Sequence, residues 1–337
     1  LAVGSDGGLG AVPGVAATHP TLNPGSGNRA TLKASSTFSM NANRNVSLAS
    51  GTAIIDTNGN NLTIAGNVSG SGLLNKSGAG NLTLTGANSG TATGGITIDS
   101  GIVFTNDQSN LPSGTITLNG TAGISNGSNA ANYSNVVVNG TNSIVKTGSN
   151  NIIGLGNLSG GGNLTFGGTY VNDFTGNMSS FTGTIIANGG GSRWNGSTGG
   201  TNVTLDLGGT GSSVRSSTTG VTLGALAGSS TASLSGAAGG PTQAVTYTIG
   251  GKTVGGLGLV AVNSTFDGAI TNGANTTGLT KVGLSTLTLN GTSTYTGATT
   301  VSAGTLLVNG ALGNTAVSVN NGGKLGGTNG VIGSGTA

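Results

Sequence analysis

Carboxylate side chains are the first candidates for chemistry in this sequence. Two carboxylates held close together can act as acid and base on a glycosidic bond, and clusters of carboxylates bind Ca²⁺. The sequence has seven acidic residues, all of them aspartate: Asp6, Asp56, Asp99, Asp107, Asp173, Asp206 and Asp267. They are isolated from one another and mostly stand beside Gly, Asn or Thr, which is typical of Asx turns and strand ends. We therefore predict no acid–base pair and no metal site among them.

The remaining motifs for nucleophiles, phosphates and metals are incomplete. A serine hydrolase needs a histidine oriented by a carboxylate, and the one histidine, His19, lies in a proline-flanked segment. Gly251-Lys252-Thr253 is a fragment of a phosphate-binding loop, but no helix is predicted to follow it. Gly160-Gly161-Gly162 and Gly189-Gly190-Gly191 lack the aspartate of calcium-binding nonapeptide repeats. The sequence predicts a protein that is not an enzyme and has no catalytic, cofactor-binding or metal-binding residues.

Composition argues against several kinds of partner. Ten basic and seven acidic residues give a net charge of +3, and the basic residues are scattered singly, whereas a nucleic-acid interface concentrates them. We predict no nucleic-acid partner. No apolar run reaches the length of about 18 residues that a membrane-spanning helix needs. Cysteine is absent, which fits export through a periplasm. The first residue is Leu1 rather than methionine, so we expect a portion of a longer precursor.

Any functional group must be positioned by β-strands, because the sequence has no stretch with apolar residues at helical spacing. Glycine supplies 70 of the 337 residues, and between the glycines short runs alternate apolar residues with threonine or asparagine. These runs recur at intervals near 20 residues, roughly the length of one solenoid rung. They include 61–64, 81–84, 96–98, 115–118, 136–138, 163–166, 184–186, 203–205, 221–223, 245–249, 286–289, 305–308 and 317–319. Asn-Gly, Gly-Gly and Ser-Gly steps between them supply sharp corners.

An antiparallel sandwich or barrel is the alternative all-β architecture, since Asn119-Gly120 and Asn139-Gly140 could form hairpin turns. The even spacing favours the solenoid, and so does a correspondence between residues 76–106 and 281–309. Both segments pass from a lysine through a Leu-Thr-Leu run to a second strand and then a glycine. Asn-x-Ser/Thr triplets are abundant, as at Asn61. We interpret them as asparagine side chains that stack along the solenoid, and glycosylation of these asparagines is the alternative.

The second of these segments resembles a known repeat family. Residues 278–291, Gly-Leu-Thr-Lys-Val-Gly-Leu-Ser-Thr-Leu-Thr-Leu-Asn-Gly, and residues 295–306, Tyr-Thr-Gly-Ala-Thr-Thr-Val-Ser-Ala-Gly-Thr-Leu, are similar to the autotransporter-associated β-strand repeat. A degenerate copy begins near Gly72. The resemblance implies a right-handed parallel β-helix with almost no α-helix, located outside the cell or on the outer surface of a Gram-negative-type bacterium. It does not extend to a translocator barrel, which this sequence lacks.

Residues 1–45 differ in style from the rest of the chain. They contain Pro13, Pro20, Pro24 and His19, and we predict an atypical N-terminal cap, arm or linker, because the ends of solenoids need covering sequence. Residues 46–337 are predicted to form the β-helix, with degenerate repeats that are clearest at 61–106 and 263–310.

A structural or adhesive role follows from this interpretation. We expect a ligand on a host or neighbouring cell, or end-to-end self-association through exposed terminal rungs into a filament. Two other classes stay open. A polysaccharide lyase or hydrolase would need aspartates to converge in one groove with Arg193, Arg215 or a lysine. A glycan-binding surface module would have a shallow site near Trp194, Tyr170 or Tyr247.

Overall fold

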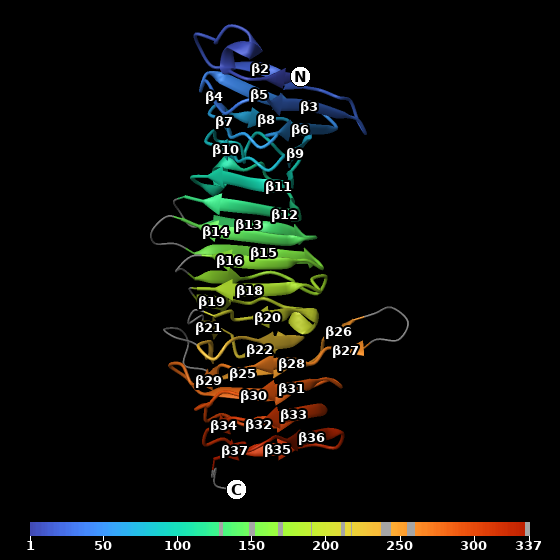
Figure 1. Ribbon diagram of the computed structural model, residues 1–337, viewed down its shortest axis with the longest axis vertical. Coiled ribbons are helices and arrows are strands. Elements are labelled where there is room, and N and C mark those ends of the chain that lie inside the picture. Colours follow the sequence, from blue (N-terminus) through green and yellow to red (C-terminus); the bar gives the residue numbers. More distant parts are fainter. Residues whose placement is uncertain are drawn as a thin grey trace. The chain divides into compact units, whose positions relative to one another are not determined.

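The structure is a computed structural model that describes residues 1–127, 131–147, 152–167, 171–189, 191–209, 213–216, 218–236, 244–254 and 260–333. Contacts divide the chain into two compact units, Leu1–Gly154 and Leu155–Ala337. Each unit is a stack of short parallel strands, with successive segments of the chain laid one beside the next (Figure 1).

Unit 1 contains strands β1 to β14 and two short 3-10 helices. Strand β15, Ile153–Gly160, crosses the boundary between the units. In chain order the elements are β1 (Ala2–Val3), η1 (Asp6–Leu9), β2 (Ala17–Leu22), β3 (Arg29–Ala34), β4 (Phe38–Met40), β5 (Arg44–Leu48), β6 (Thr52–Asp56), β7 (Leu62–Ile64), β8 (Val68–Ser69), β9 (Leu73–Ser77), β10 (Leu82–Leu84), β11 (Ile96–Thr105), η2 (Gln108–Asn110), β12 (Ile116–Asn126), β13 (Ala131–Val138) and β14 (Thr141–Lys146).

The strands of unit 1 form three parallel ladders. One contains β1, β3, β6, β9, β11, β12 and β13. A second contains β4, β7, β10, β11, β12 and β14, and a third contains β2, β5 and β8. The register places Leu62 beside Leu82, and Ile116 beside Val136. These offsets of twenty positions match the predicted rung length.

Unit 2 repeats this arrangement with a larger set of short strands. They are β16 (Asn163–Gly167), β17 (Asn172–Phe174), β18 (Thr184–Asn188), β19 (Gly191–Trp194), η3 (Gly200–Asn202), β20 (Thr204–Asp206), β21 (Ser213–Ser216), β22 (Gly220–Leu223), β23 (Ala225–Ala227), β24 (Ser233–Ser235), β25 (Val245–Ile249), β26 (Thr253–Val254), β27 (Val260–Ala261), β28 (Ser264–Phe266), β29 (Ala269–Thr271), β30 (Thr277–Lys281), β31 (Thr286–Leu289), β32 (Thr299–Val301), β33 (Gly304–Val308), β34 (Ala311–Leu312), β35 (Val317–Val319), β36 (Gly323–Gly326) and β37 (Val331–Ile332).

Parallel ladders also organise unit 2. They include β22–β25–β30–β32–β35 and β28–β31–β33–β36. Strands β26 and β27 pair antiparallel and form a hairpin that leaves the stack (Figure 1).

The core of each unit is a column of mostly aliphatic side chains, with buried aromatic rings such as Tyr133 in unit 1 and Phe266 in unit 2. Alternate residues of a strand point inward, as in the pattern of buried and half-buried positions along β6 and β7. Ile55 and Ile98 are buried in unit 1, and Ile249 and Val301 in unit 2. The outward positions are mixed, as in Thr52, Ile54 and Asp56 on β6.

The all-β parallel solenoid predicted from the sequence is confirmed. Every predicted strand run lies on a strand of the structure, and the helices in the described part of the chain are three short 3-10 turns. Residues 1–45 contribute β1 to β4 and the first residues of β5 to the parallel ladders. A functional division at residue 45 stays a prediction.

Asparagine side chains connect successive rungs on the surface of unit 1, as predicted. Nδ2 of Asn75 donates to Oδ2 of Asp99 and Nδ2 of Asn119 donates to Oδ1 of Asp99, both at 2.8 Å, and Nδ2 of Asn139 donates to Oδ1 of Asn119 at 3.0 Å. The pattern follows from the register, because equivalent side chains lie above one another.

The close approach of one rung to the next requires glycine at position 80. A Cβ atom there would lie 1.8 Å from the carbonyl oxygen of Asn60, while a Cβ atom at Gly90 would meet nothing within 4 Å. We predict that Gly80→Ala lowers the free energy of unfolding by about 3 kcal/mol, because the backbone of two rungs must separate. The matched control Gly90→Ala should change it by less than about 1 kcal/mol. Urea unfolding of both variants measures the difference, and equal stabilities would contradict the close-packed rung.

Candidate functional site

The seven aspartates are dispersed, and most of their carboxylates bind a neighbouring group. Asp6 pairs with the buried Arg44 at 2.8 Å between Oδ1 and Nε. Asp107 accepts from the backbone of Ser109 at 2.9 Å, as the N-cap of η2. Asp206 accepts from the backbone of Gly208 at 2.9 Å. Among the described residues no three His, Cys, Asp or Glu side chains form a group that could hold a metal ion.

Asp173 binds Arg193, one of the arginines that the polysaccharide-enzyme alternative would need beside its aspartates. Asp173 on β17 forms a bidentate ion pair with Arg193 on the next rung, and this hydrogen bond raises the pKa of Arg193. The backbone of Arg215 follows in register, and its side chain lies outside the described residues. The pair therefore contains one carboxylate rather than the two that acid–base cleavage of a glycoside needs.

His19 and Lys252 both bind backbone or side-chain oxygens. The Nε2 atom of His19 contacts the carbonyl oxygen of Leu9. Nζ of Lys252 donates to Oγ1 of Thr204 at 2.7 Å and to the carbonyl oxygen of Gly183 at 3.3 Å, and burial lowers its pKa.

The aromatic residues suggested as a glycan platform lie mainly inside unit 2. Trp194 is 2% exposed and stacks on Phe174 with ring centroids 4.8 Å apart, although its edge lines a hollow of about 240 Å³. Tyr247 is buried and donates to the carbonyl oxygen of Ser235 at 2.6 Å, and burial raises its pKa. Tyr170 lies outside the described residues.

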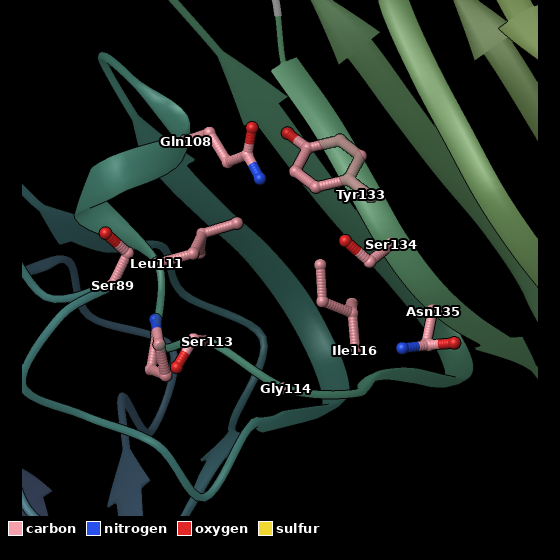
Figure 2. Close-up of a pocket in the computed structure, with 10 residues that line it drawn as sticks. Ser89, Gln108, Leu111, Ser113, Gly114, Ile116, Tyr133, Ser134 and Asn135 are labelled. Carbon is pink, nitrogen blue, oxygen red and sulfur yellow. The ribbon is translucent and has the colours of Figure 1, made fainter.

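A cleft that the sequence did not reveal opens in unit 1 between η2 and β13. Figure 2 shows Gln108 and Leu111 on one side facing Tyr133, Ser134 and Ile116 on the other. Its volume is about 130 Å³. Leu111, Ile116 and Tyr133 are buried and form the floor, whereas Ser134 is exposed at the rim. Burial raises the pKa of Tyr133 to about 12, so its hydroxyl stays protonated at neutral pH.

The cleft keeps its shape through a side-chain clasp. Gln108 donates through Nε2 to the carbonyl oxygen of Asn132, and Asn132 donates its backbone N–H to Oε1 of Gln108 at 2.7 Å. Asn110 anchors the other end of η2, because its Nδ2 donates to the carbonyl oxygens of Thr85 and Gly86 at 3.0 and 2.9 Å. The sequence signal was the Asp107 to Asn110 capping box, which predicts a turn but not what the turn encloses.

Two lysines that the sequence suggested were ordinary scattered charges are buried in the core. Lys76 lies in register between Ile55 and Ile98, and Lys281 between Ile249 and Val301. Both side chains are 0% exposed. The aliphatic stem therefore continues the apolar column, and only the ammonium group must find polar partners.

Carbonyl oxygens at the corner of the rung surround each ammonium group. Nζ of Lys76 donates to Oγ1 of Thr57 at 3.0 Å and to the carbonyl oxygens of Gly78 at 2.6 Å and Ser100 at 3.0 Å. Nζ of Lys281 binds the carbonyl oxygens of Val282 at 2.6 Å and Ala303 at 3.3 Å.

The charge of these two ammonium groups persists near neutral pH. Burial lowers the pKa of Lys76 to about 8, against a smaller opposing effect of Asp56, and burial lowers the pKa of Lys281 to about 8 as well. Both groups therefore remain mostly protonated at pH 7, where each can donate three N–H groups to the corner.

The fold and the repeated corner define a class of protein, the parallel β-solenoids built from degenerate repeats. A family model described as the passenger-associated-transport-repeat matches residues 74–103 and 279–308, the two segments that contain the buried lysines. The chain thus carries two such repeats on an autotransporter-passenger-like β-helix, which confirms the resemblance seen in the sequence. No curated protein and no solved structure matches the chain.

These observations indicate an exported, surface-associated passenger domain. None of the helices in the described ranges is long and apolar enough to cross a membrane.

We predict that Lys76→Met lowers the free energy of unfolding at pH 7 by about 2 kcal/mol, because the corner oxygens lose their donor. Lys324→Met is the matched control, since Lys324 is exposed on β36, and it should cost less than about 0.5 kcal/mol. Chemical denaturation of the two variants makes the comparison. A Lys76→Met variant as stable as the wild type would show that the ammonium group contributes nothing to the corner.

Proposed function

We propose that this chain is a non-enzymatic structural and adhesive module displayed outside a bacterial cell. The observation that carries the proposal is the pair of passenger-associated-transport repeats, both built on the same lysine corner. The long parallel ladders support a scaffold rather than a reaction centre. So do the contacts of the aspartates, since Asp99 binds Asn75 and Asp173 binds Arg193. Exposed threonine and asparagine side chains give the module a polar surface with few charges, suited to contact with other cell-surface molecules.

Surface display tests this proposal. The chain would be placed between a secretory signal peptide and an outer-membrane translocator barrel in a Gram-negative cell, with an epitope tag inserted at the open Gly90 turn. We expect an antibody to label intact cells. The double variant Lys76→Met/Lys281→Met should reduce labelling, and Lys324→Met should not. Retention of the wild-type chain inside cells that display an unrelated passenger would contradict the proposal.

A more specific part of the proposal is that copies of this chain associate end to end into a filament. In the described residues β35, β36 and β37 each pair on one side with the preceding rung, and Val319, Val331 and Ile332 are exposed there. A strand edge without a partner pairs readily with another chain, so this part of the proposal applies to a form of the protein in which no further rung covers β35, β36 and β37. Multi-angle light scattering of the purified chain at rising concentration should show growing oligomers that Val331→Asp suppresses. A monomer at every concentration would remove the filament from the proposal.

A further inference from the structure

We infer that the cleft between η2 and β13 binds a single neutral sugar ring. The inference concerns a site in unit 1 and does not depend on the proposed structural role. It rests on the chemistry of the lining residues, on the way the cleft is held open and on its size.

The lining residues form two kinds of wall. Leu111, Ile116 and the ring of Tyr133 make a buried apolar floor. Ser134 brings a hydroxyl to the opening, and Gln108 brings an amide whose Nε2 and Oε1 atoms also bind the backbone of Asn132 (Figure 2). Ser89, Ser113 and Asn135 complete the rim. A pyranose presents one face of C–H groups and an edge of hydroxyl groups, which complement this arrangement.

The lining carries no formal charge. Its polar groups are hydroxyls and amides, each able both to donate and to accept hydrogen bonds. Charge-assisted binding of a phosphate or carboxylate uses a cation, and a hard metal ion such as Ca²⁺ is usually bound by carboxylates, and the lining offers neither. The nearest acid along the chain, Asp107, is used as the N-cap of η2. Oγ of Ser113 donates to the carbonyl oxygen of Ala92 at 3.2 Å. A neutral polyhydroxylated ligand is therefore the class that matches the chemistry of this lining.

The size of the cleft limits the ligand to one ring. Pockets for drug-sized molecules have volumes of roughly 300 to 1,000 Å³, whereas this cleft has about 130 Å³. A longer oligosaccharide could enter with one terminal residue and leave the others in solvent.

The cleft is formed before any ligand arrives. The clasp between Gln108 and Asn132 joins η2 to β13, and Asn110 holds the turn on the preceding rung. Because these bonds fix both walls, binding costs little ordering entropy, which favours measurable affinity for a small ligand.

The test is a titration of the ¹⁵N-labelled chain, followed by NMR, with four probes: the methyl glycosides of glucose, galactose, mannose and N-acetylglucosamine. We expect at least one probe to shift the amide signals of Ser113, Gly114 and Ser134 saturably, with a dissociation constant in the millimolar range. If all four probes leave these signals unchanged, the inference is wrong.

A rim substitution separates binding in the cleft from binding elsewhere. Ser134→Trp places an indole over the opening without touching the buried floor, and it should weaken binding by about tenfold or more. Ser230→Trp, at an exposed turn in unit 2, is the matched control and should bind like the wild type. Both variants should keep the dispersed spectrum of the folded chain. Unaltered affinity in a folded Ser134→Trp variant would also overturn the assignment.

Discussion

The repeating register of parallel strands is the constraint on which this structure depends. Each residue lies beside the residue about one rung further along the chain, so any group placed at a corner or in the core meets an equivalent position above and below. Leu62, Leu82 and Val103 follow one another in this way. Apolar positions stack without difficulty. The polar backbone of the corners must instead find partners in every rung, because a buried carbonyl without one is costly.

The passenger-associated-transport repeats meet this constraint with a buried ammonium group. Lys76 and Lys281 fill an apolar column with their stems and bind corner oxygens with their tips. One lysine side chain thus packs in the apolar column and also donates hydrogen bonds to the corner oxygens. A leucine at the same position could only pack, and an asparagine is too short to do both.

Much of the fold could be predicted from the sequence, because strand alternation and rung spacing depend on local patterns. The two lysines could not be placed, since an isolated lysine is usually a surface residue and the corner that surrounds it exists only after two rungs have stacked. Trp194 was considered as a surface platform but packs on Phe174. The cleft could not be predicted because Gln108 and Tyr133 are 25 positions apart in the sequence. They face each other only after the hydrogen bonds between Gln108 and Asn132 have joined η2 to β13.

The parallel register is tested most directly by paired nitroxide labels, and the absence of native cysteine makes specific labelling simple. Thr63 and Thr83 face outward at adjacent positions of β7 and β10, where neighbouring strands lie about 4.8 Å apart. The doubly labelled Thr63→Cys/Thr83→Cys chain should give an electron paramagnetic resonance spectrum strongly broadened by spin–spin interaction. A spectrum equal to the sum of the two singly labelled chains would contradict the register and the solenoid built on it.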